Sequence, residues 1–477
     1  MIILIALYTY QCFTVFSYDD NDKKKRIFRR QNILMYLIHF MAFSGMYLKT
    51  GENKLLIFYL AQVLLLFFTI LLYTRIYPKS SRLIVNNMCM LLSIGFIMIT
   101  RLEYEKAVKQ CIIVAGGVFL SLIIPTIIRR MKRLSELRGL YGSIGIVALA
   151  AVVVIGRVSG GAKLGFTIGG FGIQPSEFVK ILFVFFVAAS LKQCTKFKDI
   201  VVTTAVAAFH VLILVISKDL GAALIIFVVY LVMLYVASRQ PLYIFSGIVA
   251  GSVAAMLAYR LFNHVRVRVI VWQDPFEAYD KGGYQVAQSL FAIGTGSWFG
   301  TGLFQGRADA IPVADEDFIF SAIAEEMGLL FVMGMILICL SCYVMFLNIA
   351  MQLRNNFFKL VALGLGTCYI FQTFITIGGA SKFIPSTGVT LPLVSYGGSS
   401  VLSTLIMFAI IQGLYIMSEE EEEEIERKKE QQKKDNRSRT SSQREDRHKV
   451  SGRRDRGITS PKAETKKEKE IAKQRIR

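Results

Sequence analysis

The sequence predicts an all-α polytopic membrane protein, and its composition, apolar runs and charge placement carry that prediction. Hydrophobic residues make up 54% of the 477 residues, and the mean hydropathy is +0.50. A soluble domain of this length could not bury so much apolar surface, because the buried fraction grows slowly with chain length. Nearly uncharged runs of roughly 18 residues or more recur, and each is long enough to cross a bilayer as a helix.

About thirteen such runs follow one another along the chain. The first lacks the basic start and the small-residue cleavage site of a signal peptide, so we interpret it as a span. The predicted spans lie near 2–17, 31–48, 54–74, 83–100, 107–128, 140–156, 177–194, 199–217, 219–237, 241–260, 318–348, 357–379 and 399–417.

The net charge of +21 by itself suggests a nucleic-acid partner, but its placement does not. Much of the basic excess lies in alternate loops and in the tail, as the positive-inside rule expects. Those loops therefore face the cytoplasm, the N-terminus lies outside, the C-terminus lies inside, and no nucleic-acid partner is predicted. Arg101 and Lys106 are an exception to this pattern, because the topology places these basic residues outside. The basic clusters lie at 23–30, 75–82, 129–138 and 192–198 and at Arg354.

Composition divides the chain into three parts. Residues 1–139 hold N-terminal spans, and residues 140–417 hold a membrane core with a long outer loop at 261–317. Residues 418–477 form a charged tail that opens with Glu419–Glu424 and has almost no aliphatic or aromatic content. Such a segment cannot bury enough apolar surface to fold, so we expect a disordered cytoplasmic tail.

Polar residues enter the membrane region at several places, and ionisable groups at that depth are functional candidates. In "GGFGIQPSEFVK", Glu177 lies one helical turn from Lys180, and in "SKDLGAAL" Asp219 occupies a tight turn between two spans. A salt pair at a helix mouth and an interfacial turn charge are the structural alternatives for these two motifs.

Two further stretches predict a cavity within the bundle. In "DEDFIFSAIAEEMG", Asp317, Ser321 and Glu325 recur every four residues and share one helical face, which should line a cavity and not face lipid. The stretch "FIPSTGVTLPLVSYGGSS" is rich in proline, glycine and hydroxyl groups and holds Ser395 and Ser399. It suits a re-entrant loop, because irregular backbone cannot face hydrocarbon.

The loop 261–317 supplies charged groups. In "HVRVRVIVW" the alternation predicts an extended segment with Arg266 and Arg268 on one face, and arginine suits phosphate oxygens. The acids Asp274, Glu277 and Asp280 follow, and then a glycine-rich run that we interpret as flexible packing beside a substrate groove.

Five motifs carry a resemblance to a known family, in the family's order. Within residues 140–417 the chain resembles the SEDS family (shape, elongation, division and sporulation), the RodA/FtsW/SpoVE group. Its members usually have about ten spans, so the resemblance implies a SEDS-type helical bundle with about three extra N-terminal spans. The motifs "QPSE…K", "DLG", "GYQ..QS..AIG.G…G.G", "DFIF…EE.G" and "P.TG..LP..SYGGSS" occupy Gln174–Lys180, Asp219–Gly221, Gly283–Gly302, Asp317–Gly328 and Pro385–Ser400.

The resemblance implies a peptidoglycan glycosyltransferase at the outer face of the bacterial cytoplasmic membrane. Such an enzyme polymerises lipid II, the undecaprenyl-pyrophosphate-linked disaccharide-peptide, for elongation, division or sporulation. It also implies a class B penicillin-binding protein as partner, besides membrane lipid. The candidate residues are consistent with this activity. The reaction needs a membrane cavity, a carboxylate base and cations for the pyrophosphate, and the sequence has candidates for all three. The substrate-binding candidates are Arg266, Arg268, Glu177, Lys180, Asp219, Gln288, Asp317, Glu325, Ser395 and Ser399.

The predicted base is where the chain departs from the family pattern. The family's acid stands six residues before the tyrosine of "GYQ", where this chain has Ala278. We predict Asp280 as the base, because the neighbouring Lys281 favours its ionised form and two glycines free the backbone. Asp274, at a more variable acidic position, is the second catalytic candidate.

Two other functions stay open. A scaffold that binds lipid II and a penicillin-binding protein without polymerising would account for Ala278. A lipid II flippase would account for the many spans with internal charges. A divalent cation, Mg²⁺ or Mn²⁺, is a further candidate for stabilising the leaving pyrophosphate, although no metal-ligand cluster is visible in the sequence.

Overall fold

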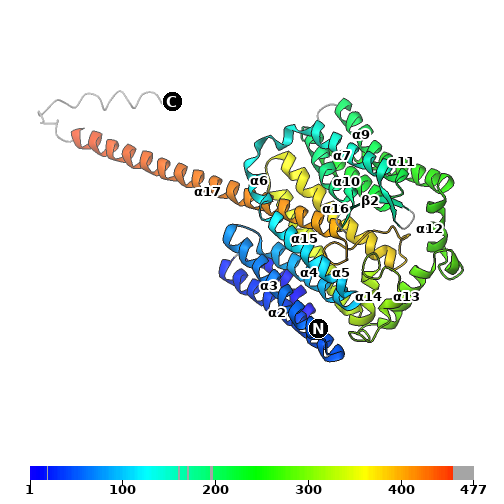
Figure 1. The fold of residues 1–477 in the computed structure, drawn as a ribbon. Coiled ribbons are helices and arrows are strands. Elements are labelled where there is room, and N and C mark those ends of the chain that lie inside the picture. The colour runs from blue at the N-terminus through cyan, green and yellow to red at the C-terminus, as the bar shows by residue number, and fades with distance from the viewer. Residues whose placement is uncertain (19, 160–161, 169–170, 194–196, 455–477) are drawn as a thin grey trace, which may run out of the picture. The chain divides into compact units, whose positions relative to one another are not determined.

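The computed structural model describes residues 1–18, 20–159, 162–168, 171–193 and 197–454, and most of them are helical (Figure 1). Contacts divide the chain into Met1–Ser418 and Glu419–Arg477. The α-helices are α1 (Ile2–Thr14), α2 (Asn21–Thr50), α3 (Asn53–Ile76), α4 (Arg82–Leu102), α5 (Tyr104–Ser121), α6 (Ile124–Arg130), α7 (Arg138–Ile155), α8 (Pro175–Leu191), α9 (Phe197–Ile216), α10 (Leu220–Ser238), α11 (Pro241–Leu261), α12 (Asn263–Gln273), α13 (Tyr284–Gly296), α14 (Ile319–Met327), α15 (Leu329–Gln352), α16 (Asn356–Ala380) and α17 (Gly398–Arg454).

Eleven helical segments in the described part of the chain are long and apolar enough to cross a membrane. The other two predicted spans coincide with shorter helices, α1 and the 17-residue α8. The prediction of one helix over 318–348 is wrong. Gly328 adopts φ 87° and separates α14 from α15. A Cβ at Gly328 would lie 2.4 Å from the backbone nitrogen of Gly300, so the passing backbone requires glycine here.

Polar side chains fasten the N-terminal helices to α4 and α15. Tyr8 Oη donates to Asn87 Oδ1 at 3.1 Å, and Asn87 Nδ2 donates to Ser341 Oγ at 3.3 Å. His39 Nδ1 lies 2.9 Å from Ser93 Oγ. All five side chains are buried. Hydrogen bonds between membrane helices contribute on average about 0.6 kcal/mol each, so α1 and α2 are held by more than apolar packing.

α8, α10 and α16 pack against one another, and α4 packs against α2, α3, α5, α14 and α15. All of the apolar window of α4 is buried. α8 packs against α7, α10 and α16, and α16 also packs against α15. α11 lies at the periphery against α10 and α12, and none of its residues, all of which the structure describes, is buried. The motif-bearing helices α8 and α10 therefore meet inside the bundle.

The long polar segments fold into short elements. The strands β1 (Arg157–Ser159), β2 (Ala162–Ile168) and β3 (Phe171–Ile173) form an antiparallel sheet in the order β1-β2-β3. The loop 261–317 contains α12, η3 (Tyr279–Lys281), α13 and η4 (Ala308–Ala310). The extended conformation predicted for "HVRVRVIVW" is wrong, because α12 covers it. Arg266 and Arg268 consequently point in different directions, since residues two apart on a helix are separated by about 200°.

The structure also differs from the predicted disorder at the start of the tail. α17 continues as a helix through the acidic run to Arg454. Glu, Lys, Gln and Arg are good helix formers, and Arg427 Nη2 lies 3.4 Å from Glu423 Oε2, four residues away. Low apolar content excludes a packed core, but it does not exclude an isolated helix of polar residues. Residues 455–477 of the predicted tail lie outside the described residues.

Candidate functional site

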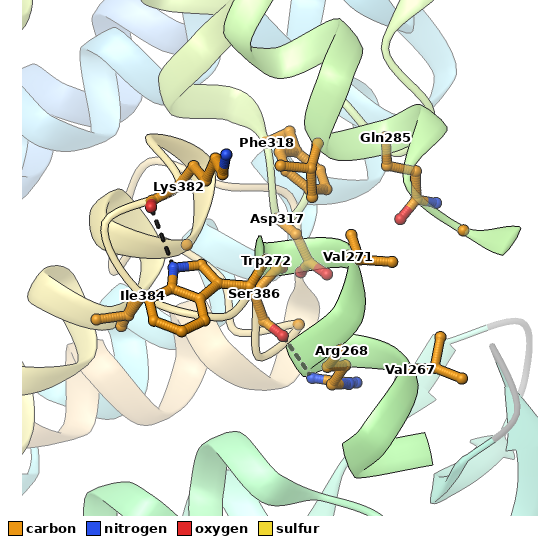
Figure 2. Close-up of a pocket in the computed structure, with 14 residues that line it drawn as sticks. Val267, Arg268, Val271, Trp272, Gln285, Asp317, Phe318, Lys382, Ile384 and Ser386 are labelled. Carbon is orange, nitrogen blue, oxygen red and sulfur yellow. Dashed lines mark hydrogen bonds between the residues drawn. The ribbon is translucent and has the colours of Figure 1, made fainter. Parts of the chain in front are cut away.

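A small polar pocket lies where α12, α13, the start of α14 and the segment after α16 meet (Figure 2). Its volume is about 150 Å³. Pockets for drug-sized ligands measure roughly 300–1,000 Å³, so this volume suits a charged group of a substrate and not a whole disaccharide. The charged lining residues are Arg268, Asp317 and Lys382, and the neutral ones include Trp272, Gln285, Phe318, Ile384, Ser386 and Gly388.

α12 supplies one wall of the pocket. Arg268 and Trp272 lie four residues apart and share one helical face. Arg268 Nη1 donates to the carbonyl of Ser386 at 2.9 Å, and Trp272 Nε1 donates to the carbonyl of Lys382 at 3.2 Å (Figure 2). These two bonds attach α12 to the irregular segment after α16 and hold the guanidinium in the pocket.

Asp317 faces the guanidinium across Gly388. A Cβ added at Gly388 would lie 3.4 Å from Asp317 Oδ2 and 3.8 Å from Arg268 Nη2. Gly388 also has φ 73°, which side chains rarely tolerate. The backbone conformation therefore favours glycine at the point where the carboxylate and the guanidinium approach each other, although a Cβ would make only ordinary contacts there.

The pocket environment shifts the pKa values of its charged groups. Burial raises the pKa of Asp317 to about 6, although the nearby Arg268 opposes the rise. Burial and the adjacent Asp315 and Asp317 likewise raise the pKa of Glu316 to about 6. Burial lowers the pKa of Arg268, while Asp317 and Asp219 oppose that change. A carboxyl group with such a pKa is mostly ionised near pH 7 and is well matched to accept a proton there.

The predicted residues Glu177 and Lys180 form a buried pair inside the bundle. Lys180 Nζ lies 2.9 Å from Glu177 Oε1 and donates to Gln372 Oε1 at 2.7 Å. Ser403 Oγ donates to Glu177 Oε2 at 3.0 Å. Neither charged group lines the pocket. The network joins α8, α16 and α17 and stabilises the bundle behind the site.

Asp219 links this interior network to the pocket. Its Oδ1 accepts from the backbone N–H of Ala222 at 3.1 Å and so caps α10. Its Oδ2 accepts from Ser176 Oγ at 2.8 Å and from Gln174 Nε2 at 3.2 Å. The carboxylate also favours the charged form of Arg268. Asp219 therefore acts on the pocket electrostatically, through the guanidinium.

Ser395 and Ser399 hold the proline- and glycine-rich segment in place. Ser395 Oγ donates to the carbonyl of Glu316 at 2.6 Å and accepts from the N–H of Leu391 at 2.8 Å. Ser399 Oγ accepts from the N–H of Gln174 at 2.9 Å. Both hydroxyls bind backbone groups of the protein, and they position the pocket wall without lining it.

The two predicted catalytic acids lie outside the pocket. Asp274 is exposed, and its Oδ1 accepts from the N–H groups of Phe276 at 2.9 Å and Glu277 at 3.0 Å. These backbone bonds lower its pKa. Asp280 is exposed in η3, two residues before the pocket-lining Gly282. Among the residues that the structure describes, Asp317 is the carboxylate that lines the pocket.

Arg266 and Gln288 do not line the pocket either. Arg266 Nη2 donates to the carbonyl of Arg260 at 3.1 Å, as the helical conformation of α12 dictates. Gln288 Nε2 donates to Tyr279 Oη at 3.3 Å. We predicted that the two arginines share one face, but Arg268 alone of the two reaches the pocket.

The three polar residues that we predicted on one helix face contact different parts of the protein. Asp317 precedes the first turn of α14 and lines the pocket. Ser321 Oγ lies 2.5 Å from Ser289 Oγ on α13. Glu325 Oε1 accepts from the N–H of Arg307 at 2.9 Å. The common cavity predicted for all three is wrong, because the helix begins after Asp317 and packs tightly on α13.

Arg101 and Lys106, which the predicted topology places outside, each form an ion pair. Arg101 Nη2 lies 3.0 Å from Glu326 Oε1, and Lys106 Nζ lies 2.7 Å from Asp315 Oδ2. Each cation neutralises a carboxylate next to the site.

Sequence reasoning missed Lys382, Trp272 and Gln285. Lys382 follows a predicted span at the end that the topology places outside, where basic residues are rarer, and that exception could have been noticed. Trp272 could not be assigned while its segment was treated as extended. No sequence pattern marked Gln285 as a candidate site residue.

The fold and the site define a multi-pass membrane protein with a charged pocket beside its long polar loop. The chain belongs to the FtsW/RodA/SpoVE family, whose model, described as a cell cycle protein, matches residues 81–420. α1, α2 and α3 precede that match.

Named relatives and solved structures agree with this membership. The peptidoglycan glycosyltransferase RodA of Mycobacterium leprae is 34% identical over 363 residues, which cover 71% of this chain and 78% of the relative. A probable peptidoglycan glycosyltransferase FtsW of Aliivibrio salmonicida is 34% identical over 310 residues, or 60% and 74% of the two chains. The crystal structure of Thermus thermophilus RodA has a TM-score of 0.53 and 24% identity over 70% of this chain and 96% of its own. A chain from a peptidoglycan synthase complex has a TM-score of 0.61 and 23% identity over 71% and 98%. At these identities the two structures support the fold alone.

Proposed function

We propose that the protein is a peptidoglycan glycosyltransferase that polymerises lipid II at the outer face of the cytoplasmic membrane. Family membership and the names of the relatives support the activity. The observation that carries the proposal is the pocket in which Asp317 faces Arg268, with Lys382 beside them. A carboxylate and two cations are the groups that transfer of a sugar from a pyrophosphate requires.

In the proposed reaction Asp317 removes a proton from the attacking sugar hydroxyl. That oxygen forms the new glycosidic bond to the anomeric carbon of the second sugar as the bond from this carbon to the pyrophosphate oxygen breaks. The electron pair leaves with the pyrophosphate, and Arg268 and Lys382 stabilise its developing charge. Arginine can hold two phosphate oxygens at once, and lysine acts as a point charge.

We assign the base to Asp317 in preference to Asp280. Asp317 lines the pocket and has its pKa raised to about 6, whereas Asp280 is exposed. Asp280 remains the second candidate, because Gly282, two residues away, belongs to the lining and could bring the η3 turn inward. Ala278, at the family's usual acid position, is buried and cannot serve.

A metal ion, a partner and the orientation in the membrane are the remaining parts of the proposal. In the described part of the chain, no three His, Cys, Asp or Glu side chains come together as metal ligands. A divalent cation would therefore have Asp317 as its protein ligand and would take substrate oxygens and water for the rest, as Mg²⁺ commonly does. We further propose a class B penicillin-binding protein as partner, an outside N-terminus and a cytoplasmic tail.

Strand extension by the purified protein in liposomes containing lipid II tests the activity. We expect glycan strands, with or without an added class B penicillin-binding protein. Absence of strands in both conditions, combined with retained lipid II binding, would support the scaffold. Transfer of a labelled lipid II across the bilayer without strands would support the flippase.

A further inference from the structure

An exposed aromatic pair follows α13, away from the pocket. Trp298 is 55% exposed and Phe299 is 74% exposed. They lie on a turn whose backbone is bound to the start of α15. The N–H of Leu329 donates to the carbonyl of Ser297 at 2.9 Å, and the N–H of Leu330 donates to the carbonyl of Trp298 at 3.2 Å. The turn is therefore fixed in position while its two largest side chains contact little protein.

The backbone of this turn is packed too closely to move freely. Gly300 has φ 78°, and a Cβ there would lie 2.4 Å from the carbonyl oxygen of Glu326. The N–H of Thr301 donates to the carbonyl of Glu325 at 2.8 Å, and the N–H of Gly302 donates to that of Glu326 at 2.9 Å. The outward orientation of the aromatic pair follows from this backbone and not from loose surface packing.

The turn lies at the level where a membrane span begins. α15 starts at Leu329 and is one of the helices long and apolar enough to cross the membrane. Its first turns expose Met333 by 46% and Leu337 by 39%, as expected for a lipid-facing surface. Trp and other aromatic side chains prefer the boundary between hydrocarbon and water, where an apolar ring and a polar N–H are both satisfied.

We propose that Trp298 and Phe299 insert into the interfacial layer of the bilayer and anchor the turn there. The turn is hydrogen-bonded to the first residues of this span, so the exposed aromatic pair lies at the end of a membrane helix, where lipid is the expected occupant. A consequence, which rests on the proposed function, concerns the pocket. α13 ends at this turn and contributes Gln285 and Val286 from its first turn to the lining, so the anchor fixes the far end of the helix that forms one pocket wall.

The chain has two tryptophans, which makes the anchor directly measurable by fluorescence. In the Trp272→Phe variant Trp298 is the sole emitter. In liposomes we expect blue-shifted emission that is quenched by brominated lipids, most strongly when bromine lies near the headgroup end of the acyl chain. The matched variant Trp298→Phe reports Trp272, whose indole N–H is bound to the carbonyl of Lys382, and we expect weaker quenching there. If Trp272→Phe does not fold, the difference between wild type and Trp298→Phe gives the same quantity.

Water-like emission from Trp298 without quenching would overturn the proposal. Quenching that disappears when a class B penicillin-binding protein is added would show a protein occupant and would overturn it as well. The fluorescence readout does not depend on catalysis. A positive result in a protein that makes no strands would therefore retain the anchor and reject the proposed function.

Discussion

Replacement of Asp317 by Asn is the sharpest test of the catalytic assignment. Asn keeps the shape of the side chain and removes both its charge and its capacity to accept a proton from a hydroxyl. We expect strand extension to fall by about a hundredfold or more, as is typical when a general base is lost. Asp280→Asn is the matched control, and we expect it to retain most of its activity because that side chain is exposed outside the pocket.

The pH dependence follows from the pKa of about 6 for Asp317. The carboxyl group is then about 90% ionised at about pH 7 and about 10% ionised at about pH 5. The wild-type rate should accordingly fall by about tenfold over that interval, and the residual rate of Asp317→Asn should not. Glu316 titrates in the same range and interacts with Asp317 but does not line the pocket, so Glu316→Gln should keep the fall in rate with its midpoint moved to lower pH.

Thermal stability separates catalysis from folding in the same variant. The folded-state pKa of Asp317 lies above its ordinary value of 3.8, so the folded protein favours the neutral carboxyl. This contribution to stability is complete at low pH and is lost as the pH rises through about 6. At neutral pH the ionised group costs about 3 kcal/mol, from about two pKa units at 1.36 kcal/mol each. Asp317→Asn should therefore unfold at the same or a higher temperature than wild type at neutral pH.

Two results would refute the reasoning about Asp317. One is wild-type strand extension by Asp317→Asn, particularly if Asp280→Asn is inactive, which would assign the base to Asp280. The other is a pH profile that is unchanged in Asp317→Asn. A large loss of thermal stability in that variant would contradict the raised pKa.

Three further predictions concern the pocket, its support and the topology. Arg268→Lys loses the planar guanidinium that contacts the segment after α16, and we expect at least a tenfold loss of strand extension with raised KM; unchanged kinetics would remove Arg268 from substrate binding. Arg101→Ala leaves the buried Glu326 carboxylate unpaired and should lower the free energy of unfolding by about 3–5 kcal/mol. Adding Glu326→Gln should restore most of that loss. An equal loss in the single variant Arg101→Ala and in the double variant would contradict the ion pair. A cysteine at Lys24 should be protected from an impermeant thiol reagent in intact cells while one at Lys281 reacts, and labelling of both would contradict the predicted topology.

The membrane architecture could be predicted from the sequence because each span is a local signal. Length and hydropathy suffice to place a helix that satisfies its own backbone hydrogen bonds. The break at Gly328 was missed for the opposite reason. It depends on the backbone near Gly300, which lies far away in the sequence and packs against that residue. Glu325 and Glu326 precede Gly328 and an apolar run follows it, so the sequence does change in polarity here, but that change alone does not specify a break in the helix.

The site was predicted less well, since its geometry depends on one secondary-structure assignment. Alternating valines and arginines are typical of a strand, and that pattern placed Arg266 beside Arg268. The segment follows α11 and forms a further helix, which directs Arg268 to Ser386 and Arg266 to Arg260. Asp317 was recognised from its motif, but its position relative to the other acids required the folded loop.

Four of the basic residues that the predicted topology places outside either pair with carboxylates of residues 315–326 or line the pocket. The topology places Arg101, Lys106, Arg268 and Lys382 outside, against the usual bias. The first two pair with carboxylates on the segment that surrounds Asp317, and the other two line its pocket. Positive charge on this side is retained because it offsets buried carboxylates or remains available to an anionic substrate. For these four cations, the contact with a carboxylate or with the pocket carries information that motif spacing alone does not.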